Sequence, residues 1–345
     1  MTPLKFAIFG TGFWARYQLA AWRELAGVEC VALCDRDRAK AEMLGREYGI
    51  DAVYEDPVRL LEEVNVDFVD IVTDVGTHAG LAKLAADRGK NVICQKPMTT
   101  SLAEAEDLVR HCREAGVRLF VHENWRWQAP IRELKRTLDT GVIGEVFRAG
   151  IDMISGFPLF QNQPFLRELE QFIITDMGSH TLDVARFLFG EASDLTAWTG
   201  RAHADIAGED HATIVMRMNS AAGREVPVLV RMAYAENFLE RECFPQTLFF
   251  IEGTLGSIEL APHYVLKVTT ATGTHSRRVT IPFYPWADPR YEVCHSSIVP
   301  CSADLLAALR SEPGAGETKA EDNLATMRLV FAAYESAAER RTVAL

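Results

Sequence analysis

Two polar residues near the middle of the chain, Asp176 and His180, have the types and spacing of a proton-transfer pair, and Asp183 lies on or near the same helix face. Asp176 and His180 are four residues apart at the start of a segment with helical character, and this spacing brings two side chains to one helix face. A carboxylate one turn from an imidazole orients the ring and raises its basicity, which suits a general acid or base. The competing interpretation is a capped helix start with a solvated histidine.

A lysine is the second candidate for chemistry. Lys96 follows a short apolar run at residues 91–94 and precedes Pro97. At the end of a strand, its ammonium group can donate a hydrogen bond to a substrate hydroxyl, or act as a base if it is held without its proton. The competing interpretation is a solvated surface lysine.

Both candidates need a reaction partner, and the start of the chain predicts a dinucleotide site. An apolar run at residues 5–9 leads into Gly10-Thr-Gly12-Phe-Trp-Ala15, and helical character follows. In a strand, turn and helix of this kind the first glycine makes the tight turn, the second admits the pyrophosphate, and a small third residue allows close packing. The phosphates then rest on the positive helix start. The alternative is a glycine turn in another α/β protein.

The second predicted strand, residues 28–34, ends at Asp35, 20 residues after Ala15. A carboxylate there accepts hydrogen bonds from the ribose hydroxyls and repels a 2′-phosphate. We therefore expect NAD as the cofactor. Arg36 beside it can stack on adenine or tolerate the phosphate, so NADP is disfavoured and not excluded.

Strands and helices continue to alternate through residue 122. Strands are predicted at 67–72, 91–94 and 118–122, and helices at 79–88 and 101–115. This alternation predicts a parallel sheet, in which ligands bind beyond the carboxyl ends of the strands. The residues at those ends are Gly12, Asp35, Thr73, Lys96 and Asn124.

The pattern changes in the second half, where strands follow one another without helices between them. Strand-like runs occupy residues 195–201, 212–218, 226–234, 247–252, 264–270 and 277–281, and the helix of Asp176 is expected at 175–189. We predict an α/β protein with an N-terminal Rossmann domain (residues 1–122) and a C-terminal α+β domain (residues 123–345) with an open, mostly antiparallel sheet. A helix at about 321–339 can pack back on the first domain. The free face of the sheet predicts a homodimer or homotetramer.

The composition limits the partners. A net charge of −12 argues against binding to nucleic acid, and no apolar run reaches the ~18 residues of a membrane-spanning helix. The first residues lack the features of a signal peptide, and the seven cysteines contain no C-x-x-C pair, so we expect a cytoplasmic protein with reduced thiols and no metal site.

These motifs together resemble the Gfo/Idh/MocA oxidoreductases, and the likeness covers nearly the whole chain. It rests on Gly10-Thr-Gly12, on Thr73…His78, on Gln95-Lys96-Pro97, on Asp176…His180 and on the tail from Tyr334 to Val343. Two residues depart from the family pattern. Gln95 stands where a glutamate is usual, so a role that needs negative charge there is in doubt, and Asp74 replaces a proline.

The resemblance implies an NAD-dependent oxidation of a sugar hydroxyl by hydride transfer to nicotinamide. The catalytic residues it implies are Lys96, Asp176 and His180. The cofactor-binding residues would be Gly10, Gly12, Phe13, Trp14, Asp35, Arg36, Thr73, Val75, His78, Gln95, Lys96 and Asn124. The sugar-binding residues would be Lys96, Asn124, Arg126, Asp152, Asp176 and His180. Either His180 or Lys96 is the base, and we favour His180. Trp125, Trp127 and the aromatic segment from Phe157 to Phe165 are candidates for a sugar-stacking wall or a lid. Core packing is the alternative, and we favour it for Trp127.

Three stretches, at residues 94–97, 122–128 and 151–157, resemble a branch of the family that oxidises the anomeric carbon of a branched tetrose to a lactone. Fold and motifs do not determine the substrate, so other interpretations stay open. These are an inositol or aldose dehydrogenase, a non-catalytic NAD-binding sensor, and an NAD-dependent glycoside hydrolase. A sensor needs no proton-transfer pair, which speaks against it.

Overall fold

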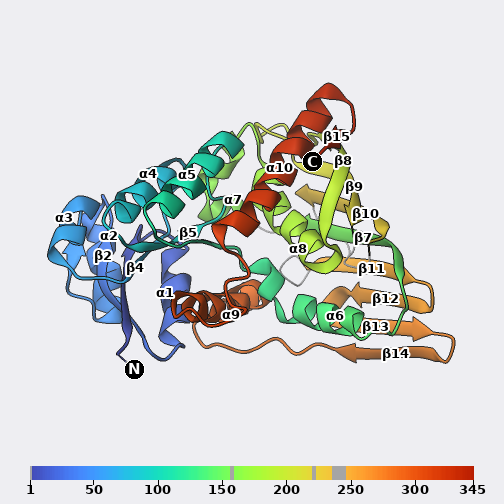
Figure 1. Cartoon of the computed structure of the whole chain (residues 1–345), viewed down its shortest axis with the longest axis horizontal. Coiled ribbons are helices and arrows are strands. Elements are labelled where there is room, and N and C mark those ends of the chain that lie inside the picture. Colours follow the sequence, from blue (N-terminus) through green and yellow to red (C-terminus); the bar gives the residue numbers. More distant parts are fainter. Residues whose placement is uncertain (1, 156–158, 220–222, 235–245) are drawn as a thin grey trace. The chain divides into compact units, whose positions relative to one another are not determined.

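A computed structural model describes residues 2–155, 159–219, 223–234 and 246–345, so Phe157 lies outside the described residues. The chain forms two compact units (Figure 1). The first contains residues 1–123 and 298–324, and the second contains residues 124–297 and 325–345. The helices α9 (Glu292–Leu309) and α10 (Ala320–Glu339) each contribute residues to both units.

The first unit is built on a parallel sheet of six strands in the order β3-β2-β1-β4-β5-β6. The strands are β1 (Leu4–Phe9), β2 (Val28–Cys34), β3 (Val53–Tyr54), β4 (Phe68–Ile71), β5 (Asn91–Gln95) and β6 (Leu119–His122). Its centre is fully buried, as expected for a parallel sheet covered on both faces. Phe6 and Phe68 stack there with ring centroids 4.9 Å apart. The predicted Rossmann architecture is confirmed.

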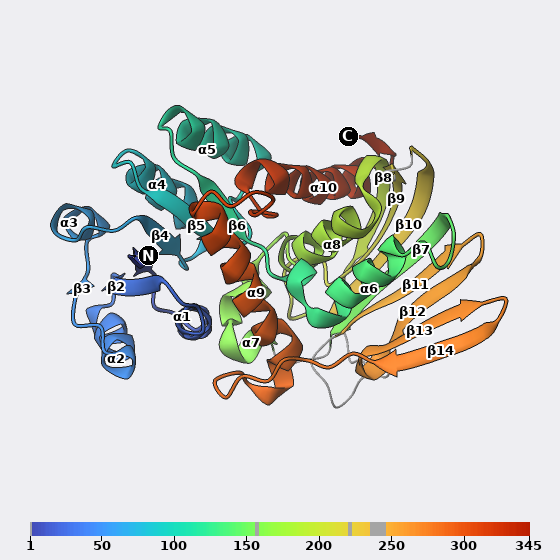
Figure 2. The same cartoon turned by 60° about the horizontal axis from the view of Figure 1, so that its bottom comes forward.

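Helices cover both faces of this sheet, with α1 and α2 on one side and α4 and α5 on the other (Figure 2). They are α1 (Ala15–Arg23), α2 (Arg38–Tyr48), α3 (Pro57–Glu63), α4 (Val75–Ala86) and α5 (Leu102–Glu114). The side chain of Ser101 caps α5 by accepting the N–H of Glu104. Asp37 and Asp56 cap α2 and α3 in the same way.

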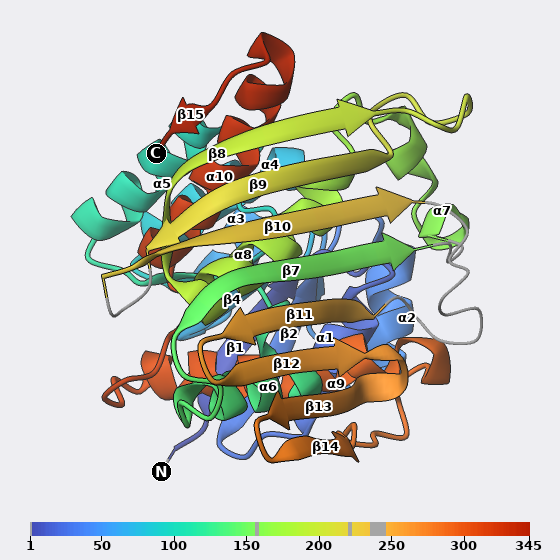
Figure 3. The ribbon, with the colours of Figure 1, turned by 90° about the vertical axis from the view of Figure 1, so that its right-hand side faces the viewer.

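The second unit contains a sheet of nine strands in the order β14-β13-β12-β11-β7-β10-β9-β8-β15 (Figure 3). Its strands are β7 (Val146–Ser155), β8 (Glu191–Gly200), β9 (His211–Asn219), β10 (Glu225–Tyr234), β11 (Thr247–Gly253), β12 (Gly256–Ala261), β13 (Val265–Thr270), β14 (Gly273–Arg278) and β15 (Val343–Ala344). Strands β7 and β10 pair in parallel, and the other described pairs are antiparallel. The prediction of a mostly antiparallel sheet is confirmed.

One face of this sheet carries the helices α6 (Ala129–Asp139) and α8 (Ser179–Phe189), which lie behind it in Figure 3. Buried and exposed residues alternate along β9 and β10, because neighbouring side chains of a strand point to opposite faces. The face away from the helices exposes large apolar side chains. They are Phe147, Trp198, Val215 and Phe250.

Some predicted element bounds were wrong. The helix expected at 175–189 is a π-helical turn, η3 (Ile174–Gly178), followed by α8. The strand expected at 277–281 is β14, which ends at Arg278. The other short elements are η1 (Trp125–Trp127), α7 (Leu159–Asn162), η2 (Pro164–Glu168), η4 (Pro262–Tyr264) and η5 (Pro289–Tyr291).

Three absences hold for the described part of the chain. None of its helices is long and apolar enough to cross a membrane. None of its cysteines forms a disulfide. No group of three or more His, Cys, Asp or Glu in these residues is placed to hold a metal ion.

Candidate active site

The glycine loop after β1 has the shape that a dinucleotide requires. Gly10 has a φ of +92°, and a Cβ atom there would lie 2.4 Å from the carbonyl oxygen of Val72, so no larger residue fits. A Cβ atom on Gly12 would meet nothing within 4 Å. The backbone at Gly12 is therefore open to a ligand, and no side chain caps the start of α1 just after it. This loop fits the pyrophosphate of NAD.

The flanking residues Phe13 and Trp14 continue this loop into the helix. Phe13 is 37% exposed and meets the ring of Tyr17 edge-on. Trp14 is the residue before the first turn of α1, and its ring also contacts Tyr17. Both predicted cofactor residues thus lie directly at the loop, as the motif requires.

Asp35, at the end of β2, is tied to the same loop. One carboxylate oxygen accepts the backbone N–H of Thr11 at 2.7 Å and the hydroxyl of Thr11 at 2.8 Å, and the other accepts the N–H of Asp37 at 2.9 Å. A carboxylate has about four acceptor positions, so capacity remains for a ribose hydroxyl. Arg36 points into solvent, where its guanidinium lies 3.8 Å from Asp74.

His78 joins the ends of β4 and β5. Its two ring nitrogens each lie 3.0 Å from a carbonyl oxygen, that of Thr73 on one side and that of Pro97 on the other. The ring is 1% exposed, and this burial lowers the pKa of His78. The imidazole therefore supports the turns that carry Thr73, Val75 (the first residue of α4) and Lys96.

Lys96 itself follows β5 and is partly exposed. Its backbone N–H donates to the side-chain oxygen of Gln95 at 3.1 Å. The side chain of Gln95, which departs from the family pattern, is therefore hydrogen-bonded to the backbone of Lys96, the predicted catalytic lysine. Within the first unit, the structure brings the predicted residues to the carboxyl ends of β1, β2, β4 and β5.

In the second unit, Asp176 lies in the π-helical turn and His180 is the second residue of α8. Single π-helical turns are uncommon in helices and occur frequently at functional sites. Asp176 is partly exposed, while His180 is 5% exposed. The ring of Trp125 stacks on the imidazole with centroids 4.4 Å apart and planes within 3°. Trp125 is 3% exposed and packs against His180 through this stack.

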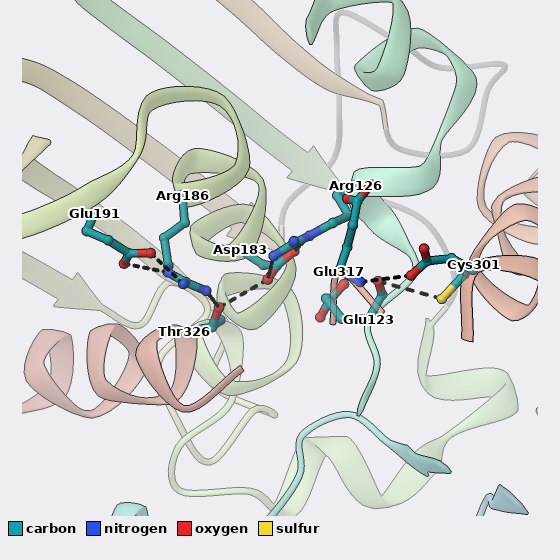
Figure 4. A network of polar contacts seen from close by, with 9 residues as sticks. Glu123, Arg126, Asp183, Arg186, Glu191, Cys301, Glu317 and Thr326 are labelled. Carbon is teal, nitrogen blue, oxygen red and sulfur yellow. Dashed lines mark hydrogen bonds and ion pairs between the residues drawn. The ribbon is translucent and has the colours of Figure 1, made fainter. Parts of the chain in front are cut away.

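Arg126 and Asp183 form a buried ion pair (Figure 4). Arg126 follows Trp125 in η1, and Asp183 lies with His180 in α8. The guanidinium donates to both carboxylate oxygens, at 2.6 and 2.7 Å, and the two residues are 5% and 0% exposed. Thr326 donates to Asp183 at 3.1 Å and accepts a hydrogen bond from Arg186, which also pairs with Glu191. Arg126, predicted to contact sugar, thus holds the turn of Trp125 against α8.

The π-helical turn is also held by Glu209 and Tyr334, a contact that the sequence did not predict. The carboxylate of Glu209 accepts the N–H groups of Phe172 and Ile174 at 3.2 and 3.1 Å. It also accepts the hydroxyl of Tyr334 at 2.7 Å, and that hydroxyl in turn accepts the N–H of Thr175 at 3.2 Å. The tail motif at Tyr334, noted for the family likeness, was the one signal for this contact.

Asn124 and Asp152, which were predicted to bind cofactor or sugar, make hydrogen bonds to other side chains and to the backbone of the second unit. The side-chain amide of Asn124, which is 3% exposed, donates to Ser297 at 2.7 Å and to the carbonyl of Cys294 at 3.2 Å. Asp152 pairs with Arg231 on the neighbouring strand at 2.5 Å. Its neighbours Ile151 and Met153 are buried on the helix side of β7, so Asp152 faces the opposite side. The structure does not bring Asp152 together with His180.

Comparisons with known proteins agree along the whole chain. Residues 4–123 match an oxidoreductase family with an NAD-binding Rossmann fold, and residues 131–259 match the GFO/IDH/MocA C-terminal domain. The D-apiose dehydrogenase of Paraburkholderia graminis is 41% identical over 99% of this chain and 89% of its own length. That of Rhizobium rhizogenes is also 41% identical, over 99% of this chain and 98% of its own.

A solved structure is similar to the same extent. An oxidoreductase from Agrobacterium radiobacter, in complex with NAD+, L-tartaric acid and magnesium, has a TM-score of 0.94 at 41% identity, covering 99% of this chain and 98% of that chain.

Proposed function

We propose, because the chain belongs to the Gfo/Idh/MocA family of oxidoreductases, that this NAD-dependent sugar dehydrogenase oxidises the anomeric carbon of D-apiose to a lactone. The observation that supports D-apiose as the substrate is the 41% identity to two D-apiose dehydrogenases over 99% of this chain. The resemblance of three separate stretches to that branch agrees with it.

The catalytic roles are part of this proposal. NAD, when bound, accepts the hydride that leaves the sugar carbon. The O–H proton of the hydroxyl on that carbon must leave in the same step, and His180, oriented by Asp176 and by the Trp125 ring, takes it. Lys96 donates a hydrogen bond to that oxygen as negative charge develops. Asn124 is assigned to the nicotinamide end of the site.

A preference for NAD over NADP is the finer cofactor proposal. Asp35 is held by Thr11 and Asp37, so its negative charge cannot swing away from the ribose position. A 2′-phosphate would meet this charge directly, and Arg36, paired with Asp74 in solvent, compensates it only in part.

We also propose self-association and a reducing compartment. The sheet face that carries Phe147, Trp198, Val215 and Phe250 supports a homodimer or homotetramer formed through the second unit. The described cysteines form no disulfide, which supports the expectation of a cytoplasmic enzyme.

NADH formation across a panel of sugars and polyols that includes D-apiose, with NAD and NADP in parallel reactions, tests the proposal. The expected result is a clear preference for D-apiose and NAD. Turnover of inositol or of an aldose in place of D-apiose would support the reaction class and exclude D-apiose as the substrate. NAD binding without turnover of any compound would favour a sensor, and glycoside cleavage without NADH release would favour the hydrolase.

A further inference from the structure

A carboxyl group with no part in the mechanism above lies in the centre of the first unit. Asp70 stands in the middle of β4 and is 0% exposed. Its oxygens accept the side-chain N–H of Gln18 at 2.7 and 2.8 Å and the indole N–H of Trp22 at 2.8 Å. A buried acid in the central strand of a parallel sheet is costly, so its partners need an explanation.

The hydrogen bonds from Asp70 run toward Lys96 through two glutamines. An ionised carboxylate can only accept, so Gln18 must turn its NH2 group to Asp70 and its carbonyl to the other side. That carbonyl accepts the side-chain N–H of Gln95 at 2.6 Å. The carbonyl of Gln95 is thereby directed to the backbone N–H of Lys96, at 3.1 Å. Gln18 is 0% exposed and Gln95 is 9% exposed, so water offers little substitute.

We propose that Asp70 is a positioning residue: it sets the direction of a hydrogen-bond relay, Asp70–Gln18–Gln95, that orients the Lys96 turn. The proposal rests on the proposed function, since Lys96 is catalytic only there. It also accounts for the glutamine at position 95. With Asp70 ionised, the atom that faces Gln18 from position 95 must be a donor, and a glutamate has none.

A reversal of the relay follows from the same geometry. In Gln95→Glu, two acceptors face each other, either between positions 95 and 18 or, if Gln18 flips, between positions 18 and 70. Asp70→Asn supplies an NH2 group for the flipped Gln18 and keeps an oxygen for Trp22. The double variant therefore reverses the two hydrogen bonds between positions 70, 18 and 95, while Trp22 and the N–H of Lys96 still donate as before, with the carboxylate now beside Lys96.

The experiment is a double-mutant cycle of Gln95→Glu, Asp70→Asn and both together. Each protein is measured for D-apiose turnover, for its Kd for NADH and for its Tm. Reactions are run at about pH 8.5, because burial raises the pKa of Asp70 to about 7 and the acid is ionised above it. Gln95→Glu is expected to lose about 10- to 100-fold in turnover, the equivalent of one or two buried hydrogen bonds. The double variant should recover most of it and bind NADH more tightly than Gln95→Glu.

Trp22→Phe is the matched control. It removes the other donor to Asp70, which helps to hold the pKa of that acid down, and loosens the packing against Phe6 and Phe68. The hydrogen bonds from Gln18 to Asp70 and from Gln95 to Gln18 keep both their donors and their acceptors. Trp22→Phe should lower Tm while turnover per folded enzyme is retained. A structural role of Asp70 alone predicts that turnover falls with Tm in all variants.

The outcomes separate this inference from the proposed function. Effects of the two substitutions that simply add, in both turnover and NADH binding, overturn the relay. If Gln95→Glu fails to fold, the double variant must fold, and its failure overturns the relay too. A wild-type protein that oxidises no sugar refutes the proposed function, while the cycle in NADH binding still decides the relay.

Discussion

Replacing Arg126 with methionine tests how the second unit holds His180, the proposed base. The substitution keeps the bulk of the side chain and removes both hydrogen bonds to Asp183, which is 0% exposed. Loss of one member of a buried ion pair generally costs about 3–5 kcal/mol of folding free energy. In a unit of this size each kcal/mol lowers Tm by about 2–4 °C, so we expect a fall of roughly 6–20 °C.

The assay is calorimetry of the Arg126→Met protein, with turnover measured well below its Tm. Turnover should fall as well, because Arg126 is the residue after Trp125, whose ring supports His180. Lys267→Met is the control. It removes an ion pair of similar length, 3.1 Å to Glu259, between side chains that are 40% and 42% exposed. Such exposed pairs contribute at most about 1 kcal/mol, so Tm should barely change.

The double variant Arg126→Met with Asp183→Leu decides whether the pair is responsible. It removes both charges of the pair, so it should be more stable than Arg126→Met, which leaves Asp183 without its guanidinium partner. A double variant that loses the sum of the two single effects would refute the buried-pair reasoning. An Arg126→Met protein with unchanged Tm and a raised KM for sugar would instead make Arg126 a substrate ligand.

Three further predictions concern pH, the π-helical turn and the base. Burial lowers the pKa of His122 from its ordinary 6.5 to about 4. As the pH falls below 6.5, His122 therefore binds a proton in the unfolded chain but stays neutral in the folded chain, so the free energy of unfolding decreases between pH 6.5 and about pH 4. In His122→Phe, Tm should depend less on pH over this range. Tyr334→Phe removes the hydroxyl that joins Glu209 to Thr175, so kcat should fall roughly 10-fold while the KM for NAD stays unchanged. Equal changes in kcat and in the KM for NAD would contradict a positioning role. His180→Ala should abolish the pH dependence of the rate, whereas Lys96→Ala should lower the rate and keep that dependence; the opposite pattern would make Lys96 the base.

The nucleotide-binding half is readable from the sequence because its signals are local. Gly10 and Gly12 are required by a turn and a close approach that involve only the nearest strands, and Asp35 ends the next strand along the chain. The relay was not predicted, yet one sign of it was visible. Asp70 is a charged residue inside the apolar run of a buried strand, which normally needs a partner.

The supports of the second unit are not readable in this way. Arg126 and Asp183 are 57 residues apart, and neither position has a local pattern that reveals the pair. The π-helical turn has no distinct periodicity in so short a segment, so the sequence predicted a continuous helix through Asp176. Helix α9 was missed because Pro300 lies inside it and polar residues from His295 to Ser297 face the interior.

The most direct test of the proposed reaction uses D-apiose carrying deuterium on its anomeric carbon. With the purified enzyme and NAD, deuterium should appear in the NADH, and the sugar should become a lactone. The rate should show a primary isotope effect if hydride transfer, and not product release, limits turnover. NADH without deuterium would contradict the assignment of the anomeric carbon. No NADH from D-apiose, while other sugars are oxidised, would contradict the assignment of D-apiose.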